Sequence, residues 1–347
     1  MVENIYRPQR VECPSVVSKS TQSTMKRTLL AIIAAAISIV ACNKTEVLDT
    51  NRQAIAFGEA FVDNATKAAI DGSYSGTKTL TTFNVWGSVT GNGNTVNVFD
   101  GATCSGQIGD EVWGCNQTQY WLPSCSYNFI ALVDADLNNG LTKNSVNMPT
   151  AIAFDSNGEK DLLIATASTS TNDAAEPGQN PVEFTFRHLL SKAFFTFKNE
   201  AGGDNYAFEI TDISVLNIHN SGVYTIGADV PWAVTGGVSS SPLSFGNAVY
   251  ENDDSFLKNG KSATSTNART FIPTEYGAGN KFKVSFKANM VYKGEVIGSK
   301  THEIEVQHTF AINSSYNFII KLGAGSKITF TVNELEGWGE VPEIEIH

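Results

Sequence analysis

The sequence predicts an all-β protein built from two tandem antiparallel β-sandwich domains. Apolar and polar residues alternate in short runs that recur about every ten residues, with Gly, Asn and Asp between the runs. The composition is rich in Gly (29) and Phe (20), which favours strands and turns and excludes a helical bundle. At 347 residues the chain is too long for one sandwich and long enough for two.

The charge balance excludes one class of partner. Hydrophobic residues make up 41% of the chain and charged residues 17%, so the chain is apolar enough to fold. The formal net charge is −11. An acidic surface repels polyanions, and nucleic acid is therefore not an expected partner.

The first forty residues have the pattern of an export signal. Met25-Lys26-Arg27 is followed by an uncharged run from Leu29 to Ala41, which is too short to span a bilayer and ends at Cys42. We expect translation to start at Met25, with residues 1–24 a mis-called start. Cleavage before Cys42 removes five basic and two acidic residues, so the charge becomes (24 − 5) − (35 − 2) = −14.

The order of the strands follows from the alternation after the polar segment 42–52, which we interpret as a tether. The linker-like run 168–181 and the glycine-rich run 201–205 are alternative domain boundaries. Predicted strands lie at 54–57, 80–89, 95–99, 119–122, 127–133, 161–167, 182–187, 193–198, 208–218, 222–226, 281–288, 316–322 and 327–332.

Several short motifs occur in an order that resembles a known family. The run Ile39-Val40-Ala41-Cys42 resembles a bacterial lipobox. It is followed by QYWLP at 119–123, YNFIA at 127–131, DLLIA at 161–165, FTFRHLLSK at 184–192, and ITFTV at 328–332 before GWG at 337–339. In that order these motifs resemble the fimbrillin-like surface lipoproteins of anaerobic gut and oral bacteria, from residue 54 to the C-terminus.

The resemblance implies a fold, a location and an assembly mechanism. It implies transthyretin-like sandwiches at 53–202 and 203–347, because in that family a Phe-x-His strand closes the first domain. It implies an outer-membrane lipoprotein with lipid on Cys42, exposed at the cell surface as stalk, tip or anchor of a fimbrium that serves adhesion. In polymerising members a protease removes the first strand, and a strand from another subunit fills the groove.

Two basic residues are candidates for that proteolytic processing. Arg52 lies in the polar stretch before the first predicted strand, and Lys67 lies shortly after it. We hypothesise that cleavage at Arg52 detaches the subunit from its lipid and permits polymerisation. The alternative is that both residues are ordinary solvated surface charges.

The cysteines of the exported part leave two alternatives open. Cys104, Cys115 and Cys125 have no CxxC or Cys/His spacing, so no zinc site is predicted. Either one disulfide forms beside a free buried thiol, or all three are buried thiols.

Other motifs that carry chemistry are weak. The run from Asp134 to Gly140 begins like a calcium loop, but positions six and twelve hold Asn139 and Ser145, so we interpret it as a turn with Asx hydrogen bonds. No nucleophile elbow, P-loop, dinucleotide fingerprint or HExxH motif occurs. His188 follows an apolar strand and is interpreted as a hydrogen-bonded core or interface imidazole. No catalytic residue, metal or cofactor is predicted.

Tryptophans suggest the rival function of a glycan-binding surface lipoprotein. Exposed indoles offer flat apolar faces to sugar rings, and Trp113 and Trp338 are flanked by glycine, which favours exposure. Trp86 and Trp121 lie within strand-like alternation and are interpreted as core residues. A carbohydrate-active enzyme on a β-sandwich is a weaker third interpretation.

Overall fold

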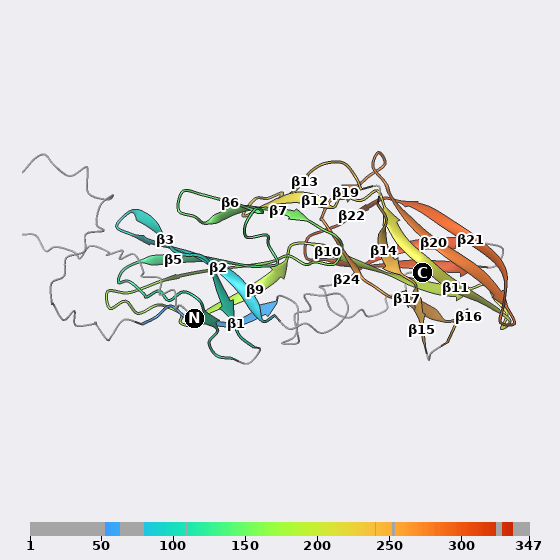
Figure 1. Ribbon diagram of the computed structural model, residues 1–347, viewed down its shortest axis with the longest axis horizontal. Coiled ribbons are helices and arrows are strands. Elements are labelled where there is room, and N and C mark those ends of the chain that lie inside the picture. Colours follow the sequence, from blue (N-terminus) through green and yellow to red (C-terminus); the bar gives the residue numbers. More distant parts are fainter. Residues whose placement is uncertain are drawn as a thin grey trace, which may run out of the picture.

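The computed structural model describes residues 53–62, 80–107, 110–239, 241–251, 254–323 and 328–335. These residues form strands and turns and contain no α-helix, which confirms the all-β prediction. No helix within these ranges is long and apolar enough to cross a membrane. Figure 1 shows an elongated molecule in which the earlier strands lie toward one end and the later strands toward the other.

A seven-stranded sheet, here called the first sheet, dominates the N-terminal half. Its order is β1-β9-β8-β5-β2-β3-β4. In chain order these strands are β1 (Phe57–Val62), β2 (Thr82–Gly91), β3 (Asn94–Ser105), β4 (Gly114–Cys115), β5 (Ser126–Val133), β8 (Leu163–Ser170) and β9 (Val182–His188). The alternation in β9 shows why they form: Val182, Phe184 and Phe186 are buried while the residues between them are exposed.

A smaller sheet covers the outer face of the first sheet. Its order is β13-β12-β7-β6, with β6 (Leu141–Lys143), β7 (Pro149–Asp155), β12 (Ser221–Thr225) and β13 (Trp232–Val234). Ile152 of β7 and Tyr224 of β12 pack against Trp86 and Ile164 of the first sheet in one buried cluster. The predicted core position of Trp86 is therefore confirmed.

Two further sheets enclose the core of the C-terminal half. One has the order β15-β17-β10-β23-β24, with β18 also paired to β10, and the other has the order β14-β11-β20-β21, with β16 paired to β11. The first contains β10 (Ser191–Glu200), β15 (Ala248–Tyr250), β17 (Ser262–Ser265), β18 (Arg269–Phe271), β23 (Ser315–Gly323) and β24 (Ile328–Leu335). The second contains β11 (Tyr206–Leu216), β14 (Leu243–Gly246), β16 (Leu257–Lys258), β20 (Phe282–Tyr292) and β21 (Glu295–Val306). A short ladder joins β19 (Glu275–Tyr276) to β22 (His308–Thr309).

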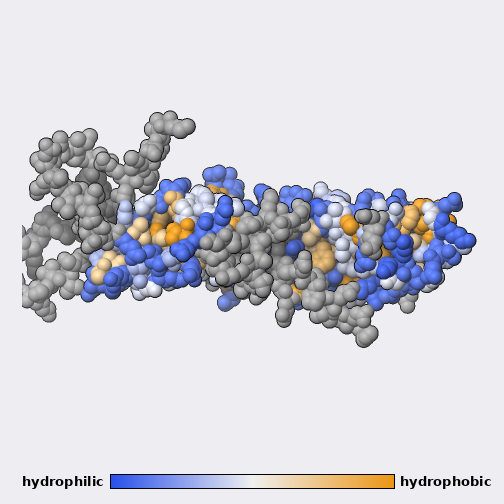
Figure 2. All heavy atoms as spheres, turned by 90° about the horizontal axis from the view of Figure 1, so that it is seen from below, coloured by the Kyte–Doolittle hydropathy of each residue, from blue (hydrophilic) through white to orange (hydrophobic). Residues whose placement is uncertain are grey.

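The apolar side chains lie mainly inside these layers. In the described part of the chain, buried residues form three clusters: one within the first sheet, one between it and the smaller sheet, and one between the two C-terminal sheets. On the face seen in Figure 2, hydrophobic residues form small separate groups among hydrophilic ones. Burial of apolar surface is the main force that holds such layers together.

Two strand pairings and one predicted strand differ from the sequence-based expectation. β1 pairs with β9 in parallel, and β10 pairs with β23 in parallel, so the predicted antiparallel pairing does not hold for these two strand pairs. Both pairs join segments more than 100 residues apart, which allows the crossover that parallel strands need. Residues 119–122 form no regular strand; Tyr120 makes an isolated bridge to Ala54.

Sheets run across the position at which the sequence predicted the domain boundary, 202/203. β10 precedes it and pairs with β17, β18 and β23, which follow it. Conversely, β12 and β13 follow it and share a sheet with β6 and β7. The chain therefore crosses between the two halves more than once.

Candidate functional site

The site of interest is the first described segment, Gln53–Val62, which we call the first-strand segment. It includes β1 and lies at one edge of the first sheet. Phe57 pairs with Val182 of β9 on one side and forms a bridge to Trp113 on the other, next to β4 at the opposite edge of the sheet. The first-strand segment thus closes the sheet at the Phe57–Trp113 bridge, although the outer side of β4 itself forms no ladder among the described residues.

One side of the segment forms what we call the β9 seam. Beyond the Phe57 pair, Ala60 lies opposite Phe184, after an irregularity in register between Phe57 and Ala60. The Val182 amide donates to the Ala56 carbonyl at 2.8 Å, and the Ala56 amide donates to Asn180 Oδ1 at 3.1 Å. The irregularity explains why Phe57 and Ala60 both face the core although they are three residues apart.

The other side forms what we call the 113–121 seam. The Trp113 amide donates to the Phe57 carbonyl at 2.8 Å, and the Ile55 amide donates to the Gln119 carbonyl at 2.8 Å. The Trp121 amide donates to the Gln53 carbonyl at 3.1 Å. Both sides of the segment are therefore satisfied by backbone hydrogen bonds, as an inserted strand requires.

Phe57 fills the centre of the first sheet's core. Its side chain is 1% exposed. Its ring stacks on Phe184 with centroids 5.5 Å apart, and meets the edges or faces of Phe83, Phe99 and Phe129 at 6.3, 5.4 and 5.5 Å. These four rings come from four different strands. Removal of the first-strand segment would therefore open a pocket lined by aromatic rings.

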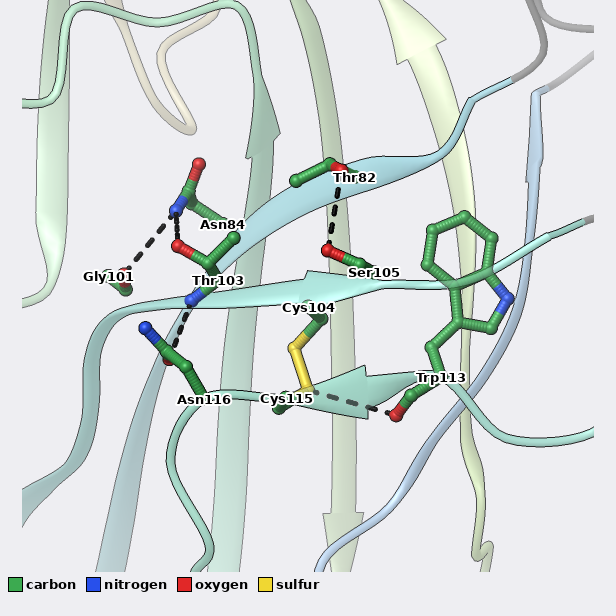
Figure 3. Close-up of a disulfide and its surroundings, with 9 residues drawn as sticks. All are labelled: Thr82, Asn84, Gly101, Thr103, Cys104, Ser105, Trp113, Cys115 and Asn116. Carbon is green, nitrogen blue, oxygen red and sulfur yellow. Dashed lines mark hydrogen bonds between the residues drawn. A yellow bond between two sulfur atoms is a disulfide. The ribbon is translucent and has the colours of Figure 1, made fainter. Parts of the chain in front are cut away.

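A disulfide lies beside the 113–121 seam. Cys104 of β3 and Cys115 of β4 lie directly opposite each other and are bridged, with their Cα atoms 4.0 Å apart (Figure 3). The alternative of three unbridged thiols is therefore wrong. Cys125 is buried in the same core and is also disulfide-bonded, so the alternative of a free buried thiol is wrong too.

A buried tyrosine supports the far end of the 113–121 seam. The Leu122 amide donates to the Tyr127 hydroxyl at 2.7 Å, and the Trp121 indole meets the Tyr127 ring edge-on with centroids 4.7 Å apart. Burial raises the pKa of Tyr127, and the hydrogen bond from Leu122 opposes that shift. The phenol therefore stays neutral at physiological pH and positions the chain that faces Gln53.

The predicted processing sites lie on either side of the first-strand segment in sequence. Arg52 immediately precedes Gln53, and Lys67 follows the last residue of β1. Both lie outside the described residues, as do Cys42 and Trp338. A cut at Arg52 would leave the first-strand segment joined to β2, whereas a cut at Lys67 would leave it held by non-covalent contacts.

The predicted exposure of Trp113 needs correction. Its side chain is 2% exposed and packs against Phe83 with ring centroids 5.3 Å apart. Gly106 makes this possible, because a Cβ at that position would lie 2.6 Å from the indole. A neighbouring glycine therefore makes room for the ring and does not leave it exposed. Trp121 is buried as predicted.

Two other predicted features have structural roles. His188 Nδ1 lies 2.5 Å from Asp161 Oδ2, and both side chains are buried, which confirms a hydrogen-bonded core imidazole. Asp136 accepts hydrogen bonds from the amides of Asn138 and Asn139, so the predicted Asx turn is confirmed. These two hydrogen bonds lower the pKa of Asp136. Within the described ranges, no group of three or more His, Cys, Asp and Glu residues is placed to hold a metal.

Sequence analysis missed the partners of the first-strand segment. The sequence predicts a strand at 54–57, but it carries no information on which distant part of the chain pairs with Phe57. Asn180 and Gln119, which receive backbone hydrogen bonds from the segment, lie in stretches interpreted as a linker and a separate strand. The Asn180-Pro181 pair directly before β9 is a local signal that could have pointed to this residue.

Comparison with solved structures shows which known proteins have a similar fold, and three of them come from Bacteroides species. A fimbrial protein from Bacteroides vulgatus is 19% identical with a TM-score of 0.55, covering 83% of this chain and all of that one. Candidate cell adhesion proteins from Bacteroides ovatus and Bacteroides uniformis are each 15% identical, with TM-scores of 0.52 and 0.50, covering 84% and 83% of this chain and 99% of each of theirs.

Sequence profiles are more specific than fold similarity. No curated protein sequence is significantly similar to this chain. The profile of the fimbrillin-like family, however, matches residues 59–338, which include nearly all of the described strands. The resemblance noted from the ordered motifs is thereby confirmed, and this chain belongs to the fimbrillin-like family.

Proposed function

We propose that this chain is a structural subunit of a bacterial surface fimbrium that serves adhesion, and that it assembles by exchange of its first strand. Family membership supports a fimbrial, adhesion-related and non-enzymatic role at the cell surface. We further propose that the two halves are transthyretin-like sandwiches, and that the chain is exported as an outer-membrane lipoprotein with lipid on Cys42.

The observation that carries the proposal is the position of Phe57 between two hydrogen-bonded seams. Loss of the first-strand segment would leave unpaired backbone groups along β9 and along residues 113–121. It would also uncover the pocket that Phe57 and Ile55 fill, where each large apolar side chain contributes about 1.5–3 kcal/mol. A strand from another subunit with a large apolar residue at the Phe57 position would satisfy both.

Strand exchange places a requirement on the cleavage site. The segment must be separated from β2 before it can leave, so the cut has to fall between Val62 and Thr82. Lys67 lies in that interval and Arg52 does not. We therefore propose Lys67 as the processing site that permits exchange, in place of the Arg52 hypothesis; cleavage at Arg52 would only detach the lipid-bearing end.

Limited trypsin digestion of the purified chain tests the proposal. The matched control is the double variant Lys67→Gln/Lys78→Gln, which lacks both lysines between β1 and β2 but keeps Arg52. Cleaved wild-type protein should form multimers on size-exclusion chromatography and release the peptide containing residues 53–62, as seen by mass spectrometry. The variant should stay monomeric. Wild-type protein that is cut in the interval but never multimerises, or a variant that multimerises equally well, would contradict the proposal.

The cellular role has its own test. Electron microscopy of cells with and without the gene should show loss of surface fibres, or of their tips, when the chain is absent. Unchanged fibres together with unchanged adhesion would contradict the fimbrial role.

A further inference from the structure

We propose that the Cys104–Cys115 disulfide is a latch for the first strand. It holds the 113–121 seam in place and so limits how readily residues 53–62 leave the sheet. The inference rests on the proposed function, because a latch has a purpose only if that strand is exchanged. It assigns the disulfide a part in the timing of exchange.

The first step is that β4 is weakly attached apart from the disulfide. β4 is two residues long and pairs with β3 through Cys104 opposite Cys115 and Ser105 opposite Gly114. It is the last strand of its sheet, so its other side makes no ladder. The Asn116 amide donates to the Thr103 carbonyl at 2.9 Å, which adds to the attachment. The Thr103 amide donates in return to Asn116 Oδ1 at 3.0 Å (Figure 3). A two-residue ladder at a sheet edge opens readily, and a covalent bridge across it prevents that opening.

The second step is that β4 positions Trp113, the residue that hydrogen-bonds to Phe57 of the first strand. Trp113 precedes β4 directly and lies two residues from Cys115 (Figure 3). Its amide donates to the Phe57 carbonyl, and its indole packs between Phe83 and the backbone at Gly106. If β4 separated from β3, the Trp113 amide would move with it, and the Phe57 carbonyl would lose its partner on this side.

The third step is that the two seams depend on different parts of the chain. The β9 seam rests on Asn180 and on β9, which is built into the middle of the sheet between β1 and β8. The 113–121 seam rests at its Trp113 end on the edge strand that the disulfide secures, and at its far end on Tyr127. The disulfide therefore controls one seam selectively, and the first-strand segment stays held on both sides only while the bridge is closed.

Amide hydrogen exchange on the full chain, measured by mass spectrometry, tests the latch. The variant Cys104→Ala/Cys115→Ala removes the bridge. The bridge closes a loop with a sequence separation of 11 residues, and the chain entropy released on its removal corresponds to an equilibrium constant for opening about 100-fold larger. Peptides containing Ile55, Trp113 and Trp121 should therefore exchange about 100-fold faster, whereas β20 and β21 in the other half should exchange as in the wild type.

A matched control leaves the disulfide intact. Asn84→Ala removes the hydrogen bond from Asn84 Nδ2 of β2 to Thr103 Oγ1 of β3, on the other side of β3 from β4, and it should leave exchange at the 113–121 seam unchanged. Unchanged exchange in the double-alanine variant would overturn the proposal. Equal acceleration throughout β5, β8 and the seam would also overturn it, because the bridge would then act as a general staple.

A second variant keeps the test informative if the double-alanine variant does not fold. Asn180→Ala removes the acceptor of the Ala56 amide and weakens the β9 seam alone. With the latch closed, Ile55 and Trp113 should keep their protection while Ala56 loses it; equal loss at all three would overturn the latch. These measurements use the monomer. The exchange results can therefore contradict the latch in a chain that does form fibres, or support it in a chain that does not. The latch and the proposed function are tested independently.

Discussion

Replacement of Phe57 by alanine should destabilise the N-terminal half by about 4 kcal/mol. The Phe57 ring is almost fully buried and contacts four other aromatic rings, which come from β2, β3, β5 and β9. Buried Phe→Ala changes cost about 3–5 kcal/mol, and the cost is greater where the surroundings cannot collapse into the cavity. Four rings anchored on four paired strands cannot all move inward, so we expect about 4 kcal/mol and not a value at the lower end of that range.

Urea unfolding followed by tryptophan fluorescence measures this effect. Trp86, Trp113 and Trp121 lie in the two N-terminal cores and report on their unfolding. Val249→Ala on β15, where the side chain is 53% exposed, is the matched control and should change the free energy of unfolding by less than about 0.5 kcal/mol. A loss below about 1 kcal/mol for Phe57→Ala would refute the view that the first-strand segment completes this core.

Three further predictions concern titratable and buried polar groups. Burial lowers the pKa of His308, so below about pH 6.5 the unfolded chain binds a proton at this residue more readily than the folded chain does. The midpoint of thermal unfolding should therefore fall as the pH is lowered, and it should fall less steeply in the His308→Phe variant. Burial raises the pKa of Tyr276 to about 12, so the unfolded chain ionises first and about 3 kcal/mol of stability should be lost between pH 10 and 12. A free energy of unfolding that does not change across this interval would contradict the raised pKa. Asp161→Ala removes the buried partner of His188 and should cost about 3 kcal/mol in urea unfolding, whereas Asp161→Asn, which keeps an acceptor, should cost less; equal losses would argue against the hydrogen bond.

Strands with one buried face were predictable from the sequence. In β9 apolar and polar residues alternate, and in β10 several apolar residues follow one another, because their side chains enter a core. The predicted ranges of both strands lie inside the observed ones. β21 was missed because its burial pattern is exposed at most positions, so neither face is apolar enough to give alternation. Backbone pairing with β20 holds β21 in the sheet, and such pairing does not require particular side chains.

The closure of the first sheet was not predictable from one sequence. Phe57 and Val182 are 125 positions apart, and their parallel pairing depends on where the whole chain folds. The burial of Trp113 shows a second limit. The glycine that accommodates its ring, Gly106, is not a sequence neighbour of Trp113. A glycine near an aromatic residue can also indicate either an exposed loop or a close approach in a core, and the sequence does not distinguish the two. The candidate tether, lipid and cleavage residues were found from motifs alone and stay predictions.

The most direct test of the central claim is the N-terminal sequence of subunits isolated from assembled surface fibres. If the first strand is exchanged during assembly, fibre subunits should begin after β1, at Ala68 if Lys67 is the processing site, and intact mass should show that residues 53–62 are absent. Fibres built of subunits that retain Phe57 within a continuous chain from residue 53 onward would contradict strand exchange at this site.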